Sequence, residues 1–312
     1  MEWDFQSVAI VGSGAIGLYY GGRLAEAGRD VKFLARSDYD QLSKSGLAVG
    51  SVAGDFHLKN ISVFKNPEEI GPVDLVIVAW KATANGALAR VLTPLMHETT
   101  QVLTLQNGLG NCEHIAEIVG ATRVYGGLCF VCINRIAPGT IHHSAGGRMT
   151  IGAFDNARYG NAETIARRFK AAQIPATAVD DLAKAQWEKL IWNIPFNGLA
   201  IAEGGVTTDL LLANPLIETE IRTLMQEIIT AAAAQGILLD QNLIESNIER
   251  TRPMGPYQPS TMIDFIEGRE LELDPIWEEP LRRAEAAGVK MPALENLLRR
   301  IKTRLTERRL VN

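Results

Sequence analysis

The stretch "SVAIVGSGAIGLYYGGRLAEAG", residues 7–28, decides the fold of the N-terminal half. It begins with a short apolar strand at 7–11 and continues through a GxGxxG loop into a helix of small residues that ends near Gly28. A second strand is predicted at 31–35, "VKFLA". A glycine-rich loop between a strand and a helix, followed by another strand, is typical of dinucleotide-binding proteins. We therefore expect a Rossmann-type domain; the alternative is a purely structural glycine turn.

Each glycine of this loop has its own physical role in such a fold. Gly12 allows the tight turn, Gly14 lets the backbone approach a pyrophosphate, and Gly17 lets the helix pack on the strand. The phosphates are expected at the positive N-terminus of the helix. The predicted cofactor-binding residues of the loop are Gly12, Ser13, Gly14, Ala15, Ile16 and Gly17.

The residues after the second strand indicate which dinucleotide binds. An NAD site usually places Asp or Glu there to hold the ribose 2′-hydroxyl. This chain has Arg36 instead, whereas Asp30 lies at the other end of the strand and Asp38 is expected in the next helix. A guanidinium is a planar fork of donors that suits a 2′-phosphate. The sequence therefore favours NADPH over NADH.

Two further apolar runs carry polar residues at their carboxyl ends. "DLVIVAW" (74–80) precedes Lys81, and "QVLTLQNG" (101–108) contains Asn107 near its end. Near-continuous apolar runs are typical of buried parallel strands, and ligands bind at the carboxyl ends of such strands. Lys81 and Asn107 are therefore predicted to meet a cofactor, although each could equally be a capping or surface residue.

The pattern changes from mixed to helical near residue 180. Before it, 124–154 predicts antiparallel strands joined by a turn at Pro138-Gly139, and 162–174 predicts a helix. After it, apolar residues recur at three- and four-residue spacing in three segments, at 216–237, 277–289 and 293–305. We predict an NADPH-binding domain at 1–180 and an all-helical substrate and catalytic domain at 181–312.

Composition excludes several classes of protein. The chain has 312 residues, 46% of them hydrophobic and 21% charged, with a net charge of −5, and lacks the basic footprint of a nucleic-acid-binding protein. No apolar run approaches the ~20 residues that span a bilayer. The N-terminus begins with acidic residues and a strand pattern rather than a signal peptide. We expect a cytoplasmic protein that binds neither nucleic acid nor membrane.

The cysteines and histidines do not predict a metal site. Cys129 and Cys132 form a single CxxC in a strand-like segment, without the second pair that a zinc ribbon needs. His142 and His143 are neighbours, and neighbours on a strand point to opposite faces of the sheet. These side chains are therefore predicted to be structural.

The segment "WEKLIWNIPFN" (187–197) places three polar side chains in an otherwise apolar helix. Lys189, Asn193 and Asn197 are four residues apart, so they lie on one face of the helix. Burying such groups without partners costs about 2–7 kcal/mol each. The stripe is therefore expected to line an active site; the alternative is a buried network in which the three side chains satisfy one another.

Together with two further residues near the C-terminal end, these motifs make the whole chain resemble the ketopantoate reductase (2-dehydropantoate 2-reductase) family. The matching pieces are "GSGAIG" (12–17), Arg36, "LQNGLGN" (105–111), "WEKLIWNIPFN", and Ser260 twelve residues before Glu272. They occur in the family's order over almost the full length. The resemblance implies an N-terminal Rossmann domain that holds NADPH and a helical domain that closes over it. It also implies reduction of 2-dehydropantoate to pantoate, a step of pantothenate biosynthesis.

The resemblance also implies a role for each matching side chain. Lys189 matches the proton donor, Asn193 and Asn197 match substrate-holding asparagines, and Asn107 matches the asparagine beside the nicotinamide. Ser260 matches a substrate-contacting serine. Glu272 matches an acid near the reaction centre, and the resemblance implies both a catalytic and a cofactor-binding role for it. The implied partner is a small-molecule 2-oxo acid, and a homodimer is compatible with the sequence.

Two departures leave the substrate open. Thr207 lies near the position of a further substrate-binding asparagine, and Pro259 precedes Ser260 where the family often has a second serine. The alternatives are a reductase of another 2-oxo acid, a β-hydroxyacid dehydrogenase, and a non-enzymatic NADPH sensor. The sensor would not need Lys189, Asn193 and Glu272, and a β-hydroxyacid dehydrogenase usually carries a glycine-rich substrate motif that this chain lacks.

Overall fold

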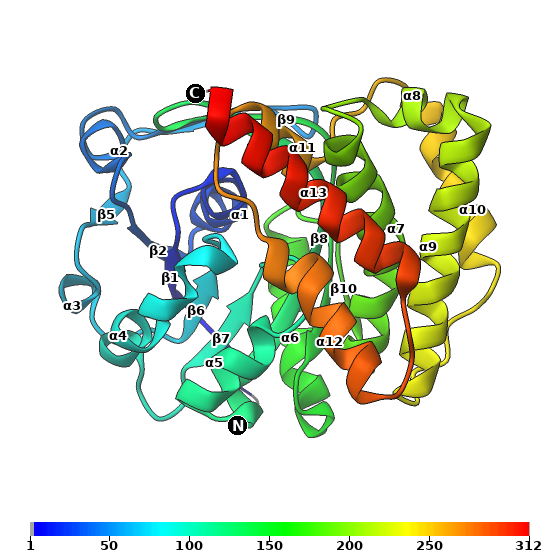
Figure 1. Ribbon diagram of the computed structural model, residues 1–312. Helices are drawn as coiled ribbons and strands as arrows, with labels where there is room; N and C mark the ends of the chain where they lie inside the picture. Colours follow the sequence, from blue (N-terminus) through cyan, green and yellow to red (C-terminus); the bar gives the residue numbers. More distant parts are fainter. Residues whose placement is uncertain (1–2, 312) are drawn as a thin grey trace. The chain divides into compact units, whose positions relative to one another are not determined.

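Six strands of one sheet follow the order that defines a Rossmann fold. In the computed structural model, which describes residues 3–311, they run β5-β2-β1-β6-β7-β8, which is 3-2-1-4-5-6 in the order of their succession along the chain (Figure 1). Every neighbouring pair in this set is parallel. The strands are β1 (Ser7–Val11), β2 (Asp30–Leu34), β5 (Ser62–Phe64), β6 (Leu75–Val78), β7 (Gln101–Thr104) and β8 (Val124–Ala137).

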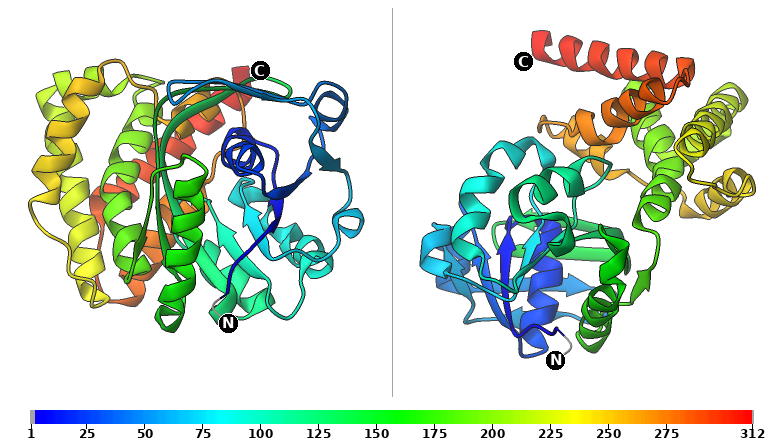
Figure 2. Two further views of the ribbon diagram at one scale, coloured as in Figure 1. Left: turned by 180° about the vertical axis from the view of Figure 1, so that it is seen from behind. Right: turned by 90° about the horizontal axis from the view of Figure 1, so that it is seen from below.

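The apolar runs form strands because both faces of this sheet are covered. All four residues of β6 are fully buried, as are Val8 to Val11 of β1. Helix α1 (Ala15–Glu26) packs on β1 and β2, and α5 (Asn111–Val119) packs on β7 and β8. Figure 2 shows helices on both faces of the strands. The predicted Rossmann-type fold is confirmed.

Four more strands extend the sheet beyond β8. The predicted hairpin forms from β8 and β9 (Thr140–Ala153), which pair antiparallel around Gly139. Strand β3 (Leu47–Ser51) pairs with β9 and with β4 (Phe56–Leu58), and β10 (Ala176–Val179) pairs with the other part of β9. The remaining helices here are α2 (Tyr39–Ser45), α3 (Pro67–Ile70), α4 (Leu88–Leu92) and α6 (Tyr159–Ala171).

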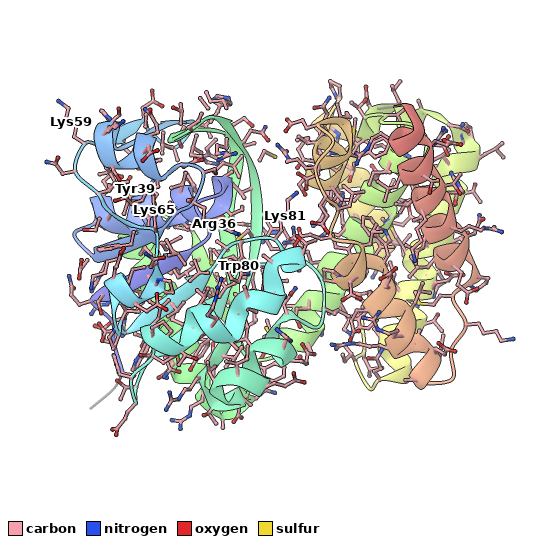
Figure 3. The ribbon with its side chains drawn as sticks, turned by 60° about the vertical axis from the view of Figure 1, so that its left-hand side comes forward. Arg36, Tyr39, Lys59, Lys65, Trp80 and Lys81 are labelled. Atoms are coloured by element: carbon pink, nitrogen blue, oxygen red, sulfur yellow. The ribbon has the colours of Figure 1, made fainter. Side chains whose placement is uncertain are left out.

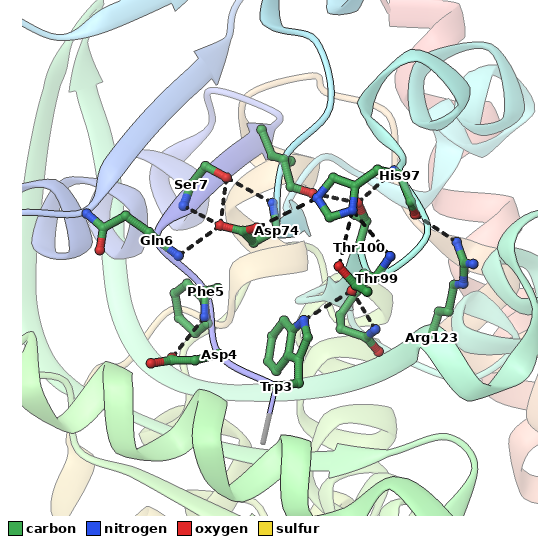
Figure 4. Close-up of polar contacts among 12 residues, drawn as sticks. Trp3, Asp4, Phe5, Gln6, Ser7, Asp74, His97, Thr99, Thr100 and Arg123 are labelled. Atoms are coloured by element: carbon green, nitrogen blue, oxygen red, sulfur yellow. Dashed lines mark hydrogen bonds and ion pairs between the residues drawn. The ribbon is translucent and has the colours of Figure 1, made fainter. Parts of the chain in front are cut away.

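A polar cluster fastens the start of β1 to the start of β6 (Figure 4). Asp74 Oδ2 accepts hydrogen bonds from the backbone nitrogens of Gln6 and Ser7, both at 2.9 Å, and from Ser7 Oγ at 2.8 Å. Burial would raise the pKa of Asp74, but these hydrogen bonds lower it below its ordinary value. The carboxylate therefore fixes the strand that carries the glycine loop.

The second compact unit is helical. The chain divides into Met1–Gln106 with Asn111–Leu182, and Asn107–Gly110 with Ala183–Asn312. The predicted helices form in the second of these units, which also contains a π-helical turn at Asp274–Glu278. Its helices are α7 (Leu182–Ala202), α8 (Thr208–Ala213), α9 (Pro215–Ala234), α10 (Leu243–Thr251), α11 (Ser260–Ile266), α12 (Glu279–Ala286) and α13 (Pro292–Val311).

The segment Asn107–Gly110 packs with the helical unit, although it follows β7. Leu109 N donates to Pro275 O at 2.9 Å, and Leu109 belongs to the apolar core of the helices. Gly108 has a φ of 85°, and a Cβ there would lie 2.1 Å from Pro275 O. A glycine at 108 is therefore required for this contact. The domain boundary expected between 180 and 181 stays a prediction.

Candidate active site

The glycine loop after β1 has the shape of an anion-binding turn. A Cβ on Gly12, whose φ is 112°, would lie 2.5 Å from Trp80 N, and one on Gly17 would lie 2.1 Å from Gly12 O. Gly14, by contrast, has no heavy atom within 4 Å of its Cβ position. The loop is thus compressed on its protein side and open at Gly14, which fits close approach of a phosphate.

The N-terminus of α1 offers donors to such an anion. Gly14 is the N-cap residue, no side chain caps the helix, and no acidic residue lies in its first turn. The first backbone N–H groups of a helix have no intrahelical acceptor and carry a partial positive charge. Ser13, Ala15 and Ile16 complete this turn, so the predicted loop residues lie together. The residues present fit a dinucleotide pyrophosphate.

The end of β2 presents a guanidinium rather than a carboxylate. Arg36 is exposed and lies on the same side of the unit as Trp80 and Lys81 (Figure 3). Asp38 is buried, forms an ion pair with Arg135, and accepts a 3.3 Å hydrogen bond from Gly139 N. This carboxylate therefore holds the β8–β9 turn. Asp38 precedes α2 instead of lying within it.

A hydrogen-bonded hub joins the loops after β6 and β7, and the sequence did not predict it. Asn85 Oδ1 accepts from Gln106 Nε2 at 2.7 Å and from Trp80 Nε1 at 3.3 Å. Asn85 Nδ2 donates to Asn111 Oδ1 at 3.0 Å. Lys81, next to Trp80, is half-buried. Asn85 lies in the 3₁₀ helix Ala82–Ala87. No sequence pattern indicates that its side chain would join the two loops.

The polar stripe on α7 begins with a held ammonium group. Lys189 is half-buried, and its Nζ donates to Asn107 Oδ1 at 3.0 Å. Asn107 lies 82 residues earlier in the chain and reaches the helix through the segment 107–110. The structure thus brings together the predicted proton donor and one of the predicted asparagines. Asn193, one turn further, is 8% exposed.

The far end of the stripe is buried and joins two helices. Asn197 is 3% exposed; its Nδ2 donates to Asn193 O at 2.9 Å, and its Oδ1 accepts from Thr261 N at 3.2 Å. Thr261 follows Ser260, the exposed first residue of α11. Asn197 therefore holds the start of α11 against α7. Glu272 is half-buried and lies between α11 and the π-helical turn.

The remaining candidate ligands are spread over β8 and β9. Cys129 and Cys132 are thiols on β8, while His142 is exposed and His143 buried on β9, as expected for neighbours on a strand. Within residues 3–311, no group of three or more histidines, cysteines and acidic residues could hold a metal ion. None of the helices in this range is long and apolar enough to cross a membrane.

The six-strand order and the glycine loop define a Rossmann-type dinucleotide-binding protein with a helical second unit. The model of the family described as ketopantoate reductase PanE/ApbA matches residues 8–156, and the model of its C-terminal part matches 181–304. The 2-dehydropantoate 2-reductase of a Nostoc species is 38% identical over 94% of this chain and 93% of its own length. The chain belongs to the ketopantoate reductase family.

Solved structures agree with this membership. The crystal structure of 2-dehydropantoate 2-reductase from Geobacter metallireducens has a TM-score of 0.93 and 43% identity, and the match covers 95% of this chain and 99% of that one. A ternary structure of D-mandelate dehydrogenase with NADH and anilino(oxo)acetate has a TM-score of 0.89 at 23% identity, over 96% of this chain and 98% of that one; this likeness shows the fold alone. The predicted family and oxidoreductase class are confirmed.

Proposed function

We propose that this protein reduces 2-dehydropantoate to pantoate with NADPH, as a cytoplasmic enzyme of pantothenate biosynthesis. The observation that carries this proposal is the 3.0 Å hydrogen bond from Lys189 Nζ to Asn107 Oδ1. The carboxamide oxygen that accepts this bond is neutral, and a lysine ammonium can donate as many as three hydrogen bonds. This arrangement suits a group that must stabilise an oxyanion. The choice of 2-dehydropantoate as the substrate rests on membership of the ketopantoate reductase family.

The cofactor assignment rests on the carboxyl edge of the sheet. Gly12, Gly14 and Gly17 would hold the pyrophosphate, Arg36 the 2′-phosphate, and Lys81 a further polar group of the cofactor. The exposure of Arg36 and the engagement of Asp38 with Arg135 support NADPH over NADH. We assign residues 1–180 to cofactor binding and residues 181–312 to the substrate, with Asn107 contributing to both.

In the proposed reaction, NADPH held by the glycine loop and Arg36 would supply a hydride to the carbonyl carbon of the substrate. Negative charge then develops on the carbonyl oxygen, and Lys189 stabilises this charge and donates a proton to it. Asn107 orients the ammonium through its neutral carboxamide oxygen. Because the ammonium is already oriented, little reorganisation is needed as the oxyanion forms.

The other members of the stripe orient the substrate. Asn193 is the proposed direct contact, since its carboxamide can donate to a carboxylate without competing as an acid. Ser260 is the proposed contact from α11, positioned through the bond between Thr261 N and Asn197 Oδ1. Asn197 is therefore proposed to act on the substrate chiefly through α11. Glu272 is proposed as the acidic group near the reaction centre and the nicotinamide.

Steady-state oxidation of NADPH with a panel of 2-oxo acids tests this function. The panel contains 2-dehydropantoate, 2-oxoisovalerate, pyruvate and phenylglyoxylate, each measured also with NADH. We expect the largest kcat/KM with 2-dehydropantoate and NADPH. A larger kcat/KM with phenylglyoxylate would favour a reductase of another 2-oxo acid on the same fold. Absence of turnover with every acid, despite NADPH binding, would favour the sensor.

A further inference from the structure

Two cationic residues follow neighbouring strands at one edge of the sheet. Strands β2 and β5 are parallel, with Leu34 paired to Phe64, and Ala35 N donates to Phe64 O at 2.9 Å. Arg36 lies two residues after Leu34, and Lys65 directly follows Phe64. Because the strands end in register, these side chains start from the same edge, and Figure 3 shows both on this side of the unit.

The start of α2 holds the ammonium of Lys65 at this edge. Its Nζ lies 4.4 Å from the centroid of the Tyr39 ring and 3.9 Å from Asp40 Oδ1. Tyr39 is joined to the Arg36 turn by a 3.4 Å hydrogen bond from its backbone nitrogen to Arg36 O. The aromatic face attracts a cation without removing its charge. Tyr39 therefore positions Lys65 toward the turn that carries Arg36.

The charge at this edge is incompletely compensated. Asp40 is 77% exposed and Lys65 56% exposed, so their 3.9 Å ion pair is solvated and weak. Asp38 is buried and paired with Arg135. Arg36 forms no side-chain hydrogen bond or ion pair with any residue from 3 to 308. A phosphate monoester carries about −1.5 to −2 charge at neutral pH and would be attracted by both cations.

We propose that Lys65 is a second 2′-phosphate-binding residue, placed beside Arg36 by the Tyr39 ring, and that Asp40 competes with the phosphate for its ammonium. The inference rests on the proposed use of NADPH. It makes cofactor preference a property of two adjacent strands rather than of β2 alone. It also predicts that removing the charge of Asp40 strengthens binding of the 2′-phosphate.

Calorimetric titration of the full-length protein with 2′,5′-ADP and with 5′-AMP tests the proposal, because the two ligands differ only in the 2′-phosphate. Lys65→Gln should weaken 2′,5′-ADP binding by about 1.5- to fivefold, as expected for a partly exposed ion pair, and leave 5′-AMP binding unchanged. Lys65→Arg should restore most of the affinity. Asp40→Asn should tighten 2′,5′-ADP alone. The loss in Lys65→Gln should shrink as salt is raised.

Lys59→Gln is the matched control, since Lys59 is an exposed lysine beyond β4, away from Arg36 in Figure 3. It should bind both ligands like the wild type, and all variants should share its melting temperature. If the wild type does not prefer 2′,5′-ADP over 5′-AMP, the proposed cofactor is wrong. If the wild type shows that preference and Lys65→Gln retains it in full, the cofactor stands and the role of Lys65 is refuted.

Discussion

The two units of this protein satisfy their buried polar side chains in different ways. In the sheet unit, ionisable groups reach segments far away in the sequence: Asp38 binds Arg135, and His143 Nδ1 lies 2.8 Å from Ser51 Oγ. In the helical unit, three buried neutral side chains donate to the carbonyl four residues earlier on their own helix. These bonds are Asn197 to Asn193 at 2.9 Å, Asn247 to Leu243 at 2.6 Å and Thr251 to Asn247 at 2.6 Å.

The difference separates residues that hold the fold from residues that are available for chemistry. The NH₂ group of a carboxamide that donates to its own helix finds its acceptor locally, and a carboxamide does not titrate. Lys189 departs from this rule, because it is charged, half-buried and bonded to a distant amide. In the sheet unit, Arg36 likewise differs from the buried ionisable groups: its side chain is exposed. Asp38, two residues later, is buried and paired with Arg135.

The largest effect is expected from Lys189→Ala. If this residue stabilises and protonates the oxyanion, its loss should lower kcat by about 10²–10⁴. NADPH affinity, measured by fluorescence, and the melting temperature should stay near the wild-type values, because Lys189 is half-buried and adds little packing. Lys184→Ala, an exposed lysine of the same helix, is the control. Lost activity together with a large fall in melting temperature would instead make the whole stripe a structural network.

A smaller effect is expected from Arg36→Ala. Its guanidinium would form charge-assisted hydrogen bonds worth about 1.5–3 kcal/mol with a 2′-phosphate. NADPH binding should therefore weaken roughly ten- to hundredfold, while NADH binding should change little. Arg90→Ala, an exposed arginine on α4, should affect neither cofactor. Equal losses of affinity for NADPH and NADH would show that Arg36 does not bind the 2′-phosphate. The distinction between an exposed ligand-binding Arg36 and a buried structural Asp38 would then fail.

Asn197→Ala should reduce stability rather than the chemical step. It removes the acceptor of the buried Thr261 N–H, and leaving such a donor unsatisfied costs about 1–3 kcal/mol. Urea unfolding should show that loss, whereas Asn242→Ala on the exposed start of α10 should stay within about 0.5 kcal/mol of the wild type. The KM for the oxo acid should rise because Ser260 is displaced. Unchanged stability with a higher KM would make Asn197 a direct substrate ligand.

The parts of the structure that the sequence predicted are those decided within one short segment. The turn at Gly12 and the contact of Gly17 with Gly12 O depend on backbone sterics of neighbouring residues, so the loop and its strand and helix could be predicted together. The four-residue spacing on α7 likewise placed Lys189 and Asn197 on one face. These patterns depend on residues close together in the sequence, so the folded chain keeps the arrangement that they predict.

Contacts between distant segments could not be predicted in the same way. The hub at Asn85 depends on side chains that arrive from two separate loops. The indole of Trp277 donates to Ile194 O at 3.1 Å, where Gly198 leaves the room that a Cβ would occupy. Spacing also could not show that Lys189 and Asn197, which belong to one stripe of α7, differ in exposure and partners. That division of the stripe required the packing of α11 and of segment 107–110.

The smallest expected effect is a dependence of the melting temperature on pH, which we attribute to His143 in the sheet unit. Burial lowers the pKa of this imidazole below its ordinary value near 6.5. Hydrogen bonds to the backbone of Ala145 and Gly146 raise the pKa, and the charges of Arg23 and His142 lower it, so the net shift is downward. The folded protein therefore prefers neutral His143. The unfolded chain, whose histidine has its ordinary pKa, binds the proton more readily.

The sign of the effect follows from this difference. The stabilising contribution of neutral His143 is fully present above about pH 6.5. It is lost as pH falls from there through the lower pKa of the folded state. The melting temperature should therefore decrease between pH 7.5 and 5.5, with a shallower decrease in His143→Gln and the wild-type slope in the exposed control His142→Gln. The carboxylates with lowered pKa, Asp4, Asp74, Glu218 and Glu279, lose their contribution only at lower pH. An equal slope in His143→Gln would show that buried ionisable groups do not distinguish the sheet unit from the helical one.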